Sequence, residues 1–223
     1  MHGYTHAIAV DFEATCFKDQ PVQELRDSEI IEFPAVLVNL KTGKVEAEFH
    51  TYVKPVERPQ LSEYCTNLTG IRQRTVDAAV TVQTAINRFT DWLKMELKVR
   101  NLVLPKMSET NPKGNCILVT WTNWDFNICL VKECERKKMR KPSCFDQWMN
   151  AKAIYRNFYK FYPYNFDKAL SRLRLTFRGR AHSGIADARN LATLLVRMYR
   201  DGAPLAVTTD LSPELQLNEN GGF

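Results

Sequence analysis

The sequence predicts an α/β fold, with a mixed central sheet between layers of helices. Two apolar runs, residues 7–13 and 116–121, are typical of buried strands. Residues 30–40 and 45–53 also have strand patterns, and the short polar segment between them predicts a hairpin. The order of these segments places the hairpin on one side of the sheet and helices on both of its faces.

Helices are predicted where apolar residues recur every three or four positions. Residues 81–98 carry apolar side chains at this spacing from Val82 to Leu97, which favours a helix packed on the sheet. Residues 103–115 contain two prolines and one glycine, so we expect a surface loop there. Further helices are expected at about 126–139, in short pieces within 152–175, and from an N-cap at Ser183 to a C-cap at Gly202.

The composition is that of one soluble enzyme domain. The 223 residues, 44% of them hydrophobic, can bury one sizeable core. We expect a single domain over residues 1–208 and a disordered tail over residues 209–223. Basic side chains outnumber acidic ones by 31 to 25, which gives a net charge of +6 and is compatible with a nucleic-acid partner.

Cysteine usage and the lack of long apolar stretches indicate an intracellular protein. The six cysteines include no Cys-x-x-Cys pair, so we expect free thiols in a reducing compartment. The first residues lack the pattern of a signal peptide, and no run of about 18 apolar residues could span a membrane. We expect a monomer in the cytoplasm or nucleus, without a membrane partner.

Acidic residues at the ends of two predicted strands point to one site. Asp11 and Glu13 lie two apart on a buried strand and therefore project from the same face. Two like charges in such a place are costly unless a cation lies between them. Asp125 follows the second apolar strand at the start of a helical pattern, which is also a favourable position for a site residue.

His182 and Asp187 lie at the start of the last predicted helix. Five helical residues correspond to ~140° of rotation, so the two side chains could not share a face if both were helical. We therefore expect His182 on the loop before the helix, folded back toward Asp187. Each of these residues alone is more often a cap or a turn residue, but their conjunction with the three earlier acids forms a specific pattern.

Five segments carry a closer match to a known family: residues 11–16, 29–34, 68–71, 157–159 and 179–185. With them the chain resembles the DEDDh-type 3′-to-5′ exonucleases of the ribonuclease H-like superfamily, and within these the Eri-type, 3′hExo-like branch. Members of this branch trim 3′ ends of RNA and, in some cases, DNA. The resemblance covers about residues 4–204 and implies a mixed five-stranded sheet flanked by helices. It departs from the family pattern at Ala186, where a second acid often precedes the residue matching Asp187.

The ligand types and the resemblance together imply metal-dependent phosphodiester hydrolysis. Carboxylates without thiolates favour hard cations, so two Mg²⁺ or Mn²⁺ ions are expected. Asp11 would bridge both ions, and Asp125 would act through one of them. Glu13 and Asp187 would lie on the side of the nucleophile. Neutral His182 would take a proton from the attacking water, and the product would be a nucleoside 5′-monophosphate.

Aromatic and basic residues are candidates for holding the 3′ end. Trp124 could stack on the terminal base, with core packing as the alternative. The resemblance implies that Tyr64 faces Trp124 across that base. Arg180 belongs to a basic segment, 172–180, that could equally bind phosphate or be solvated. The remaining residues that match positions lining the terminal nucleotide are Ala14, Thr15, Leu68 and Thr69, and for Leu68 core packing is equally open.

Two other functions are kept open. A catalytically silent RNA-binding module could retain the fold, but loss of activity normally leaves substitutions in the acids or the histidine, and all five residues are present. A phosphohydrolase of small nucleotides is disfavoured by the excess of basic over acidic side chains and by the Trp124–Tyr64 pair. The sequence does not determine RNA against DNA, the preferred structure of the 3′ end, or protein partners.

Overall fold

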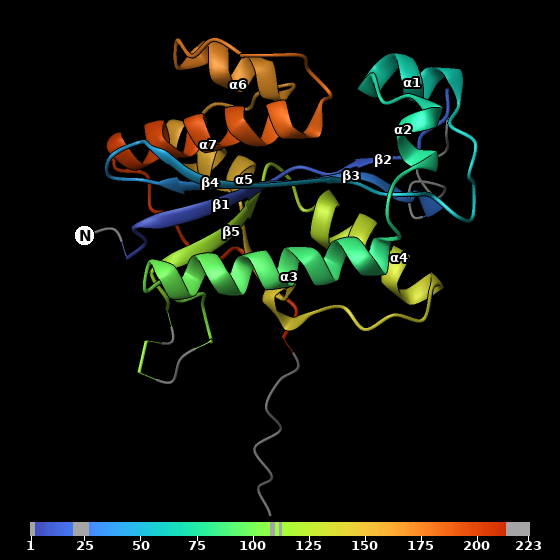
Figure 1. The fold of residues 1–223 in the computed structure, drawn as a ribbon. Coiled ribbons are helices and arrows are strands. Elements are labelled where there is room, and N and C mark those ends of the chain that lie inside the picture. The colour runs from blue at the N-terminus through green and yellow to red at the C-terminus, as the bar shows by residue number, and fades with distance from the viewer. Residues whose placement is uncertain (1–2, 20–26, 108–109, 112, 213–223) are drawn as a thin grey trace, which may run out of the picture.

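A mixed sheet with helices on both faces forms the centre of the molecule (Figure 1). The structure, a computed structural model, describes residues 3–19, 27–107, 110–111 and 113–212. Its strands are β1 (His6–Val10), β2 (Glu13–Ala14), β3 (Ile30–Asn39), β4 (Val45–Tyr52), β5 (Cys116–Thr120), β6 (Gln147–Asn150) and β7 (Thr209–Asp210). They follow the order β2–β3–β1–β5–β6–β7, with β4 paired to β3. β5 is parallel to both β1 and β6, and β3 is antiparallel to β1.

Helices cover the two faces of this sheet and one of its ends. In the described part of the chain they are α1 (Glu63–Thr69), α2 (Gln73–Asp77), α3 (Val82–Val99), the π-helix η2 (Trp124–Leu130), α4 (Val131–Arg136), the short 3-10 helix η3 (Ser143–Phe145), α5 (Ala151–Tyr159), α6 (Phe166–Arg172) and α7 (Gly184–Arg200). In Figure 1, α5, α6 and α7 lie on one face, α3 and α4 on the other, and α1 and α2 at the end near β2.

The sheet separates two apolar cores. Along β1, Val10 faces the core beneath α3, whereas Ala9 faces the core beneath α7. This alternation follows from the period of two that a strand imposes on its side chains. Phe33 on β3 is fully buried in the first core, with its ring 4.7 Å from that of Phe12 and 4.8 Å from that of Phe89. Both faces of β1 are therefore buried, and packing from two sides fixes its carboxyl end.

The α/β class, the hairpin and the long helix are confirmed. β3 and β4 are antiparallel neighbours, and α3 begins at Val82, where the Thr81 side chain caps it. The expected number of five strands is wrong, since seven occur within the described residues. The two shortest, β2 and β7, contain two residues each, and such segments are too short to show an alternating pattern.

Two further boundaries differ from the sequence-based expectation. The helix expected from residue 126 begins at Trp124 as a π-helix, and α4 ends at Arg136. Thr209 and Asp210, which the sequence assigned to a disordered tail, pair with β6. The Asp210 carboxylate also accepts a hydrogen bond from Gln147 at 2.7 Å, and this contact orders the segment. Residues 213–223 lie outside the described residues, and the single-domain boundary stays a prediction.

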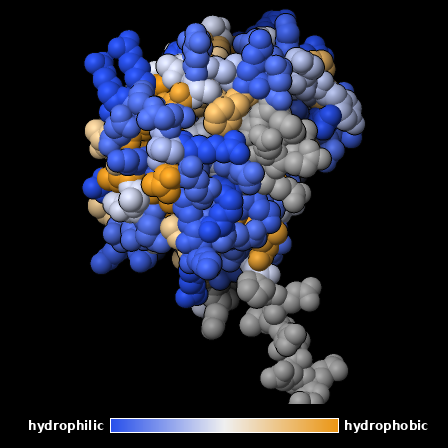
Figure 2. All heavy atoms as spheres, turned by 90° about the vertical axis from the view of Figure 1, so that its right-hand side faces the viewer, coloured by the Kyte–Doolittle hydropathy of each residue, from blue (hydrophilic) through white to orange (hydrophobic). Residues whose placement is uncertain are grey.

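The cysteines and the segment between residues 103 and 115 agree with the expectations. All six cysteines are free thiols. Between residues 103 and 115 the described positions contain neither helix nor strand, and 108, 109 and 112 lie outside the described residues. None of the described helices combines the length and the apolar composition needed to cross a membrane. The surface at the α1–α2 end is mostly hydrophilic, with apolar side chains in small separate groups (Figure 2).

Candidate active site

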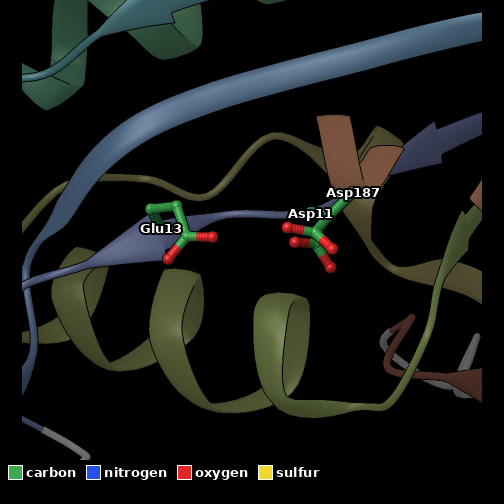
Figure 3. Close-up of side chains that lie close together, drawn as sticks. All are labelled: Asp11, Glu13 and Asp187. Carbon is green, nitrogen blue, oxygen red and sulfur yellow. The ribbon is translucent and has the colours of Figure 1, made fainter. Parts of the chain in front are cut away.

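Three carboxylates converge at the carboxyl end of β1. Asp11 directly follows β1 and Glu13 opens β2, while Phe12 between them is buried in the core. Asp187 comes from the first turn of α7. Carboxylate oxygens of Asp11, Glu13 and Asp187 lie within 4.8 Å of one another (Figure 3). These three residues and Asp125 are called the acid site below.

The start of α7 can approach β1 because residue 184 is glycine. A Cβ atom at Gly184 would lie 2.8 Å from the backbone oxygen of Asp11 and 3.1 Å from the ring of Pro34. A side chain of any size would therefore push the helix away from the strand. Gly184 permits the close approach that brings Asp187 to Asp11.

A buried glutamate holds the N-terminus of α7. Ser183 occupies the predicted N-cap position, but its side chain makes no capping hydrogen bond. Instead the carboxylate of Glu32, on β3, accepts hydrogen bonds from the backbone N–H groups of Gly184 at 3.0 Å and Ile185 at 3.1 Å. A carboxylate at this end of a helix is favourable because the free N–H groups carry partial positive charge. Glu32 thus fixes the position of Asp187 relative to β3.

Asp125 approaches the same place from η2. It is the second residue of that π-helix, and only 4% of its surface is exposed. Its Oδ1 accepts a hydrogen bond from the backbone N–H of Phe12 at 2.9 Å. This bond ties η2 to the residue between Asp11 and Glu13, so the two motifs are held together although 113 positions separate the bonded residues.

The acid site raises the pKa values of its own members. Burial is the main cause: it raises the pKa of Asp125 and of Asp187 to about 7. Burial and the negative charge of Asp187 together raise the pKa of Glu13 to about 9. The pKa of Asp11 lies well above its ordinary value because the charges of Asp125 and Asp187 add to burial. Within the described residues, no lysine or arginine forms an ion pair with any of these acids.

The donor set fits a hard divalent cation. Carboxylate oxygens are the ligands that Mg²⁺ and Mn²⁺ prefer. Oδ2 of Asp187 is buried and has no hydrogen-bond partner among the described residues. A buried polar atom of this kind costs free energy unless something binds it. The raised pKa values also favour a cation site, because a nearby cation would stabilise the ionised carboxylates.

His182 lies on the turn before α7 and outside the helix, in agreement with the prediction. Its backbone is in the left-handed region, with φ of 60°, and its side chain is exposed. Backbone N–H groups of His182 and Ser183 lower the pKa of Asp187, so this turn faces the carboxylate. The residue lines a cavity together with Asp11 and Asp187. An imidazole in this position can exchange a proton with water in the cavity.

The predicted contacts to the terminal base are partly accessible. Tyr64, on α1, is 44% exposed. Trp124, the first residue of η2, is partly buried and packs against the core beneath α3. Leu68, on α1, is also partly buried. Trp124 and Leu68 are each partly buried and partly exposed. Both core packing and contact with the terminal nucleotide are therefore compatible with their positions.

The other predicted contacts to the terminal nucleotide are buried. Ala14, on β2, is 8% exposed and Thr15 is 3% exposed. The hydroxyl of Thr15 accepts a hydrogen bond from the backbone N–H of Glu29 at 2.9 Å. The hydroxyl of Thr69 donates one to the carbonyl oxygen of Cys65, also at 2.9 Å. Both hydroxyls are thus engaged within the protein.

Arg180 has a structural contact that the sequence did not predict. Its Nη2 donates hydrogen bonds to the carbonyl oxygens of Asn67 at 2.6 Å and Leu68 at 3.3 Å, at the C-terminal end of α1. The guanidinium fills the space above Gly70, where a Cβ atom would overlap it at 1.6 Å. Arg180 therefore links the segment before α7 to α1, and its contact with phosphate stays a prediction.

A comparison with known families decides the class of the protein. The profile of the exonuclease (RNase T) family matches residues 8–195. The chain belongs to this exonuclease family. This exonuclease is 59% identical over 218 residues to the 3′-5′ exonuclease Snipper of Drosophila melanogaster. The aligned region covers 98% of this chain and 78% of Snipper. It is 43% identical over 213 residues to ERI1 exoribonuclease 2 of Danio rerio, covering 95% of the chain but 37% of that longer protein.

Solved structures give the same result. The nuclease domain of 3′hExo, a DEDDh family member bound to rAMP, matches with a TM-score of 0.80 and 34% identity over 93% of this chain and 98% of that one. A 3′-exonuclease described in recognition of the histone mRNA stem-loop matches with a TM-score of 0.80 and 33% identity, over 92% of this chain and 85% of that one. The ribonuclease H-like fold and the identification as a DEDDh-type 3′-to-5′ exonuclease are thus confirmed, and the two alternative functions are not favoured.

Sequence reasoning missed two features around this exonuclease's acid site. Glu32 lies within the segment 29–34 that carried the resemblance, but nothing local indicated that it holds α7. Lys152 and Tyr164 line the cavity that contains His182, and neither belongs to a site motif. A local pattern could not reveal these contacts, because each joins segments that are far apart in the chain.

Proposed function

We propose that this exonuclease removes nucleoside 5′-monophosphates one at a time from the 3′ ends of RNA, with DNA as a second substrate. The observation that carries the proposal is the acid site, in a member of the exonuclease family: buried and half-buried carboxylates that follow β1 or belong to β2, η2 and α7, with which no lysine or arginine of the described residues is paired. Relatives named exoribonucleases, and the 3′-exonuclease described with an RNA stem-loop, support RNA as the main substrate.

The acid site would hold two divalent cations, Mg²⁺ or Mn²⁺. When bound, these cations would neutralise charge on the scissile phosphate and make water a better nucleophile. Asp11 is the most central ligand, because the charges of the other three acids all act on its carboxylate. Glu13 and Asp187 lie with Asp11 in one group, whereas Asp125 is anchored separately through Phe12. This division supports Asp11 as the ligand shared between two ions.

His182 would act as the general base. Its exposed side chain lies beside the acid site on a turn and could accept a proton from the attacking water. The Asp187 carboxylate accepts hydrogen bonds from backbone N–H groups of the same turn. These bonds fix the position of the proposed metal ligand relative to the proposed base. The chain itself would thus orient the base, while the cations would supply the charge.

The 3′-terminal base would lie between α1 and η2. Tyr64 and Trp124 offer aromatic surfaces there, and stacking on aromatic side chains tolerates any base. Leu68 and Thr69 on α1 and Ala14 and Thr15 beside β2 would line the nucleotide, largely through backbone and apolar atoms because both hydroxyls are engaged. Arg180 would hold α1 in place for this contact.

A degradation assay with end-labelled strands tests the proposed function. Matched single-stranded, duplex and 3′-overhang RNA and DNA are incubated with Mg²⁺, with Mn²⁺ and with EDTA, carrying a label at either the 5′ or the 3′ end. We expect 3′-labelled mononucleotide to appear first and the 5′-labelled strand to shorten stepwise, with faster turnover of RNA. Full turnover in excess EDTA, or release of a 5′ label ahead of the 3′ label, would contradict the proposal.

A further inference from the structure

A cavity next to the acid site is lined by residues outside the region assigned to the terminal base. Its volume is about 310 Å³, at the lower end of the ~300 to 1,000 Å³ typical of ligand pockets. Asp11, His182 and Asp187 form one end of its wall, and the other end is built from the N-terminus of α5 and the loop before α6. The cavity therefore adjoins the place where the scissile phosphate would lie and reaches α5 and the loop before α6, and none of its lining residues belongs to α1 or η2.

The far end of this cavity carries an aromatic ring and a cation. Tyr164 is 92% exposed although it is a large aromatic residue, and its ring borders the cavity. Lys152 also borders it, with Nζ 5.9 Å from the ring centroid of Trp121, and no described carboxylate forms an ion pair with this lysine. An exposed ring beside an unpaired cation is the combination that single-stranded nucleic acid requires, because bases stack and phosphates are anionic.

The wall that carries these residues is well supported. The side chain of Asn165, next to Tyr164, caps α6 by accepting a hydrogen bond from the backbone N–H of Lys168 at 3.0 Å. The ring of Phe166 packs 5.1 Å from that of Trp121. The backbone N–H of Lys152 donates to the carbonyl oxygen of Trp121 at 3.0 Å. The chain is thus fixed directly after Tyr164, at Asn165 and Phe166, while the tyrosine residue itself stays exposed.

We propose that this cavity receives the second nucleotide from the 3′ end, with its base stacked on Tyr164 and its phosphate facing Lys152. The inference rests on the proposed function, since it takes the terminal nucleotide to lie between α1 and η2. A strand that places its terminal linkage at the acid site must continue past it, and the cavity starts at that point. The second-nucleotide site would hold the leaving side of the scissile bond in place while the terminal nucleotide is removed.

A cycle of changes in the protein and in the substrate tests this assignment. Two short RNA strands are compared that differ only in the second residue from the 3′ end, which carries either a base or an abasic sugar. Dissociation constants are measured by fluorescence anisotropy in EDTA, and kcat/KM is measured in Mg²⁺. For the wild-type protein, we expect removal of the second base to weaken binding by about fivefold or more, the size of one stacking contact. In Tyr164→Ala we expect the effect of removing the second base to disappear. In Tyr164→Phe, which keeps the ring, we expect the effect to persist.

Two further variants sharpen the result. Tyr162→Ala is the matched control, because Tyr162 is 70% exposed two residues away, with its ring under Arg156 rather than in the cavity. It should keep the full dependence on the second base. Lys152→Met should reduce the slope of log affinity against log salt by about 0.7, the share of one phosphate contact on a single strand.

The outcomes separate this site from the proposed function. An equal penalty for base removal in wild type and Tyr164→Ala, with normal degradation of both strands, would overturn the second-nucleotide site alone. If no strand were degraded under any condition, the proposed function would be overturned, and the anisotropy cycle would still decide whether the base contacts Tyr164. An unchanged salt slope in Lys152→Met would overturn the phosphate contact.

Discussion

Two groups of buried and half-buried acids in this protein have different surroundings. The acid site consists of Asp11 and three further carboxylates, and among the described residues no lysine or arginine is paired with them. The second group, called the Lys137 group, consists of Glu29, Glu133 and Lys137. Glu29 and Glu133 are both fully buried, and Lys137 on the segment after α4 donates a hydrogen bond to Glu29 at 2.7 Å and another to Glu133.

The electrostatic consequences differ accordingly. Burial raises the pKa of Glu29, but hydrogen bonds from Lys137 and from three backbone N–H groups outweigh it, and the net shift is downward. At Glu133 burial outweighs the same lysine, and the pKa of that carboxyl stays raised. In the acid site backbone N–H groups oppose burial at Asp125 and Asp187, but no lysine or arginine of the described residues pairs with any member, and every member has a raised pKa. The comparison teaches that this fold can neutralise buried acids with its own cation. Where it does not, the carboxylates are available to an external cation.

Removing one acid from each group should give the largest contrast. Asp11→Asn should lower the exonuclease rate by about 10³-fold or more, because the cations would lose their shared ligand. Glu133→Gln should keep the rate near that of the wild type, since the hydrogen bonds of its carboxylate within the described residues go to Lys137 and the backbone N–H of Ile30 and not to the acid site. Both rates are measured on a 3′-labelled RNA strand, with circular dichroism as the control for folding. Comparable rates for Asp11→Asn and wild type would refute the assignment of the acid site.

His182, beside the acid site, should affect the rate of the chemical step. It should not change the charge of the acid site. His182→Ala is expected to lower the single-turnover rate by about 10² to 10⁴-fold, the usual contribution of a general base. Binding of the RNA strand should be retained, because His182 supplies no carboxylate to the acid site. Single-turnover kinetics and anisotropy separate these two effects. A near-normal rate would leave His182 as a residue of the turn only.

Breaking the Lys137 group should affect stability instead of chemistry. Lys137→Met would leave two buried glutamates without their cation, and the free energy of unfolding should fall by about 3 to 5 kcal/mol. Lys132→Met is the matched control, because Lys132 forms only a partly exposed pair with Glu135 and should lose less than about 1 kcal/mol. Urea denaturation measures both values. Equal losses in the two variants would contradict the distinction between buried and exposed pairs.

Glu32 tests the link between the sheet and the acid site. Its carboxylate holds the start of α7 and contacts His50 Nε2 at 2.8 Å, so Glu32→Ala should displace Asp187 and lower activity by about 10 to 100-fold. Glu32→Gln retains one oxygen acceptor and should recover part of the loss. The apparent affinity for Mg²⁺, from the rate at varied metal concentration, should fall with the activity. A loss that left the metal dependence unchanged would argue against a positioning role.

The smallest effect concerns pH and metal together. Without metal, carboxyls with pKa values near 7 and 9 keep their protons in the folded protein at a pH where the unfolded chain has released them. Their contribution to stability is therefore complete below about pH 4 and is lost as pH rises toward 7 and 9. Mg²⁺ binds the ionised acids, so its stabilising effect should grow over the same range. We expect the rise in Tm on adding Mg²⁺, of the order of a few degrees, to be larger at pH 8 than at pH 5. An equal rise at both pH values would contradict the raised pKa values.

The sequence determined the features that depend on short-range patterns. A continuous apolar run predicted β1, two strand-like segments around a short polar turn predicted the hairpin of β3 and β4, and helical spacing predicted α3, because burial on a sheet or beneath a helix restricts where apolar residues stand in the chain. The same patterns placed Asp11 at the end of a buried strand and His182 outside the last helix. The family resemblance then joined the acids and the histidine into one candidate site.

Only the tertiary structure decided how these elements are held together. The carboxylate of Glu32 caps α7 across 152 positions of the chain, and Asp125 binds the backbone of Phe12 across 113. The pairing of Lys137 with Glu29, the contact of Arg180 with α1, and the cavity beside Tyr164 are equally remote in sequence. Such contacts follow from the way complete elements pack against each other. A local spacing therefore carries no trace of them, although they decide which buried charges are paired and which are left for a metal.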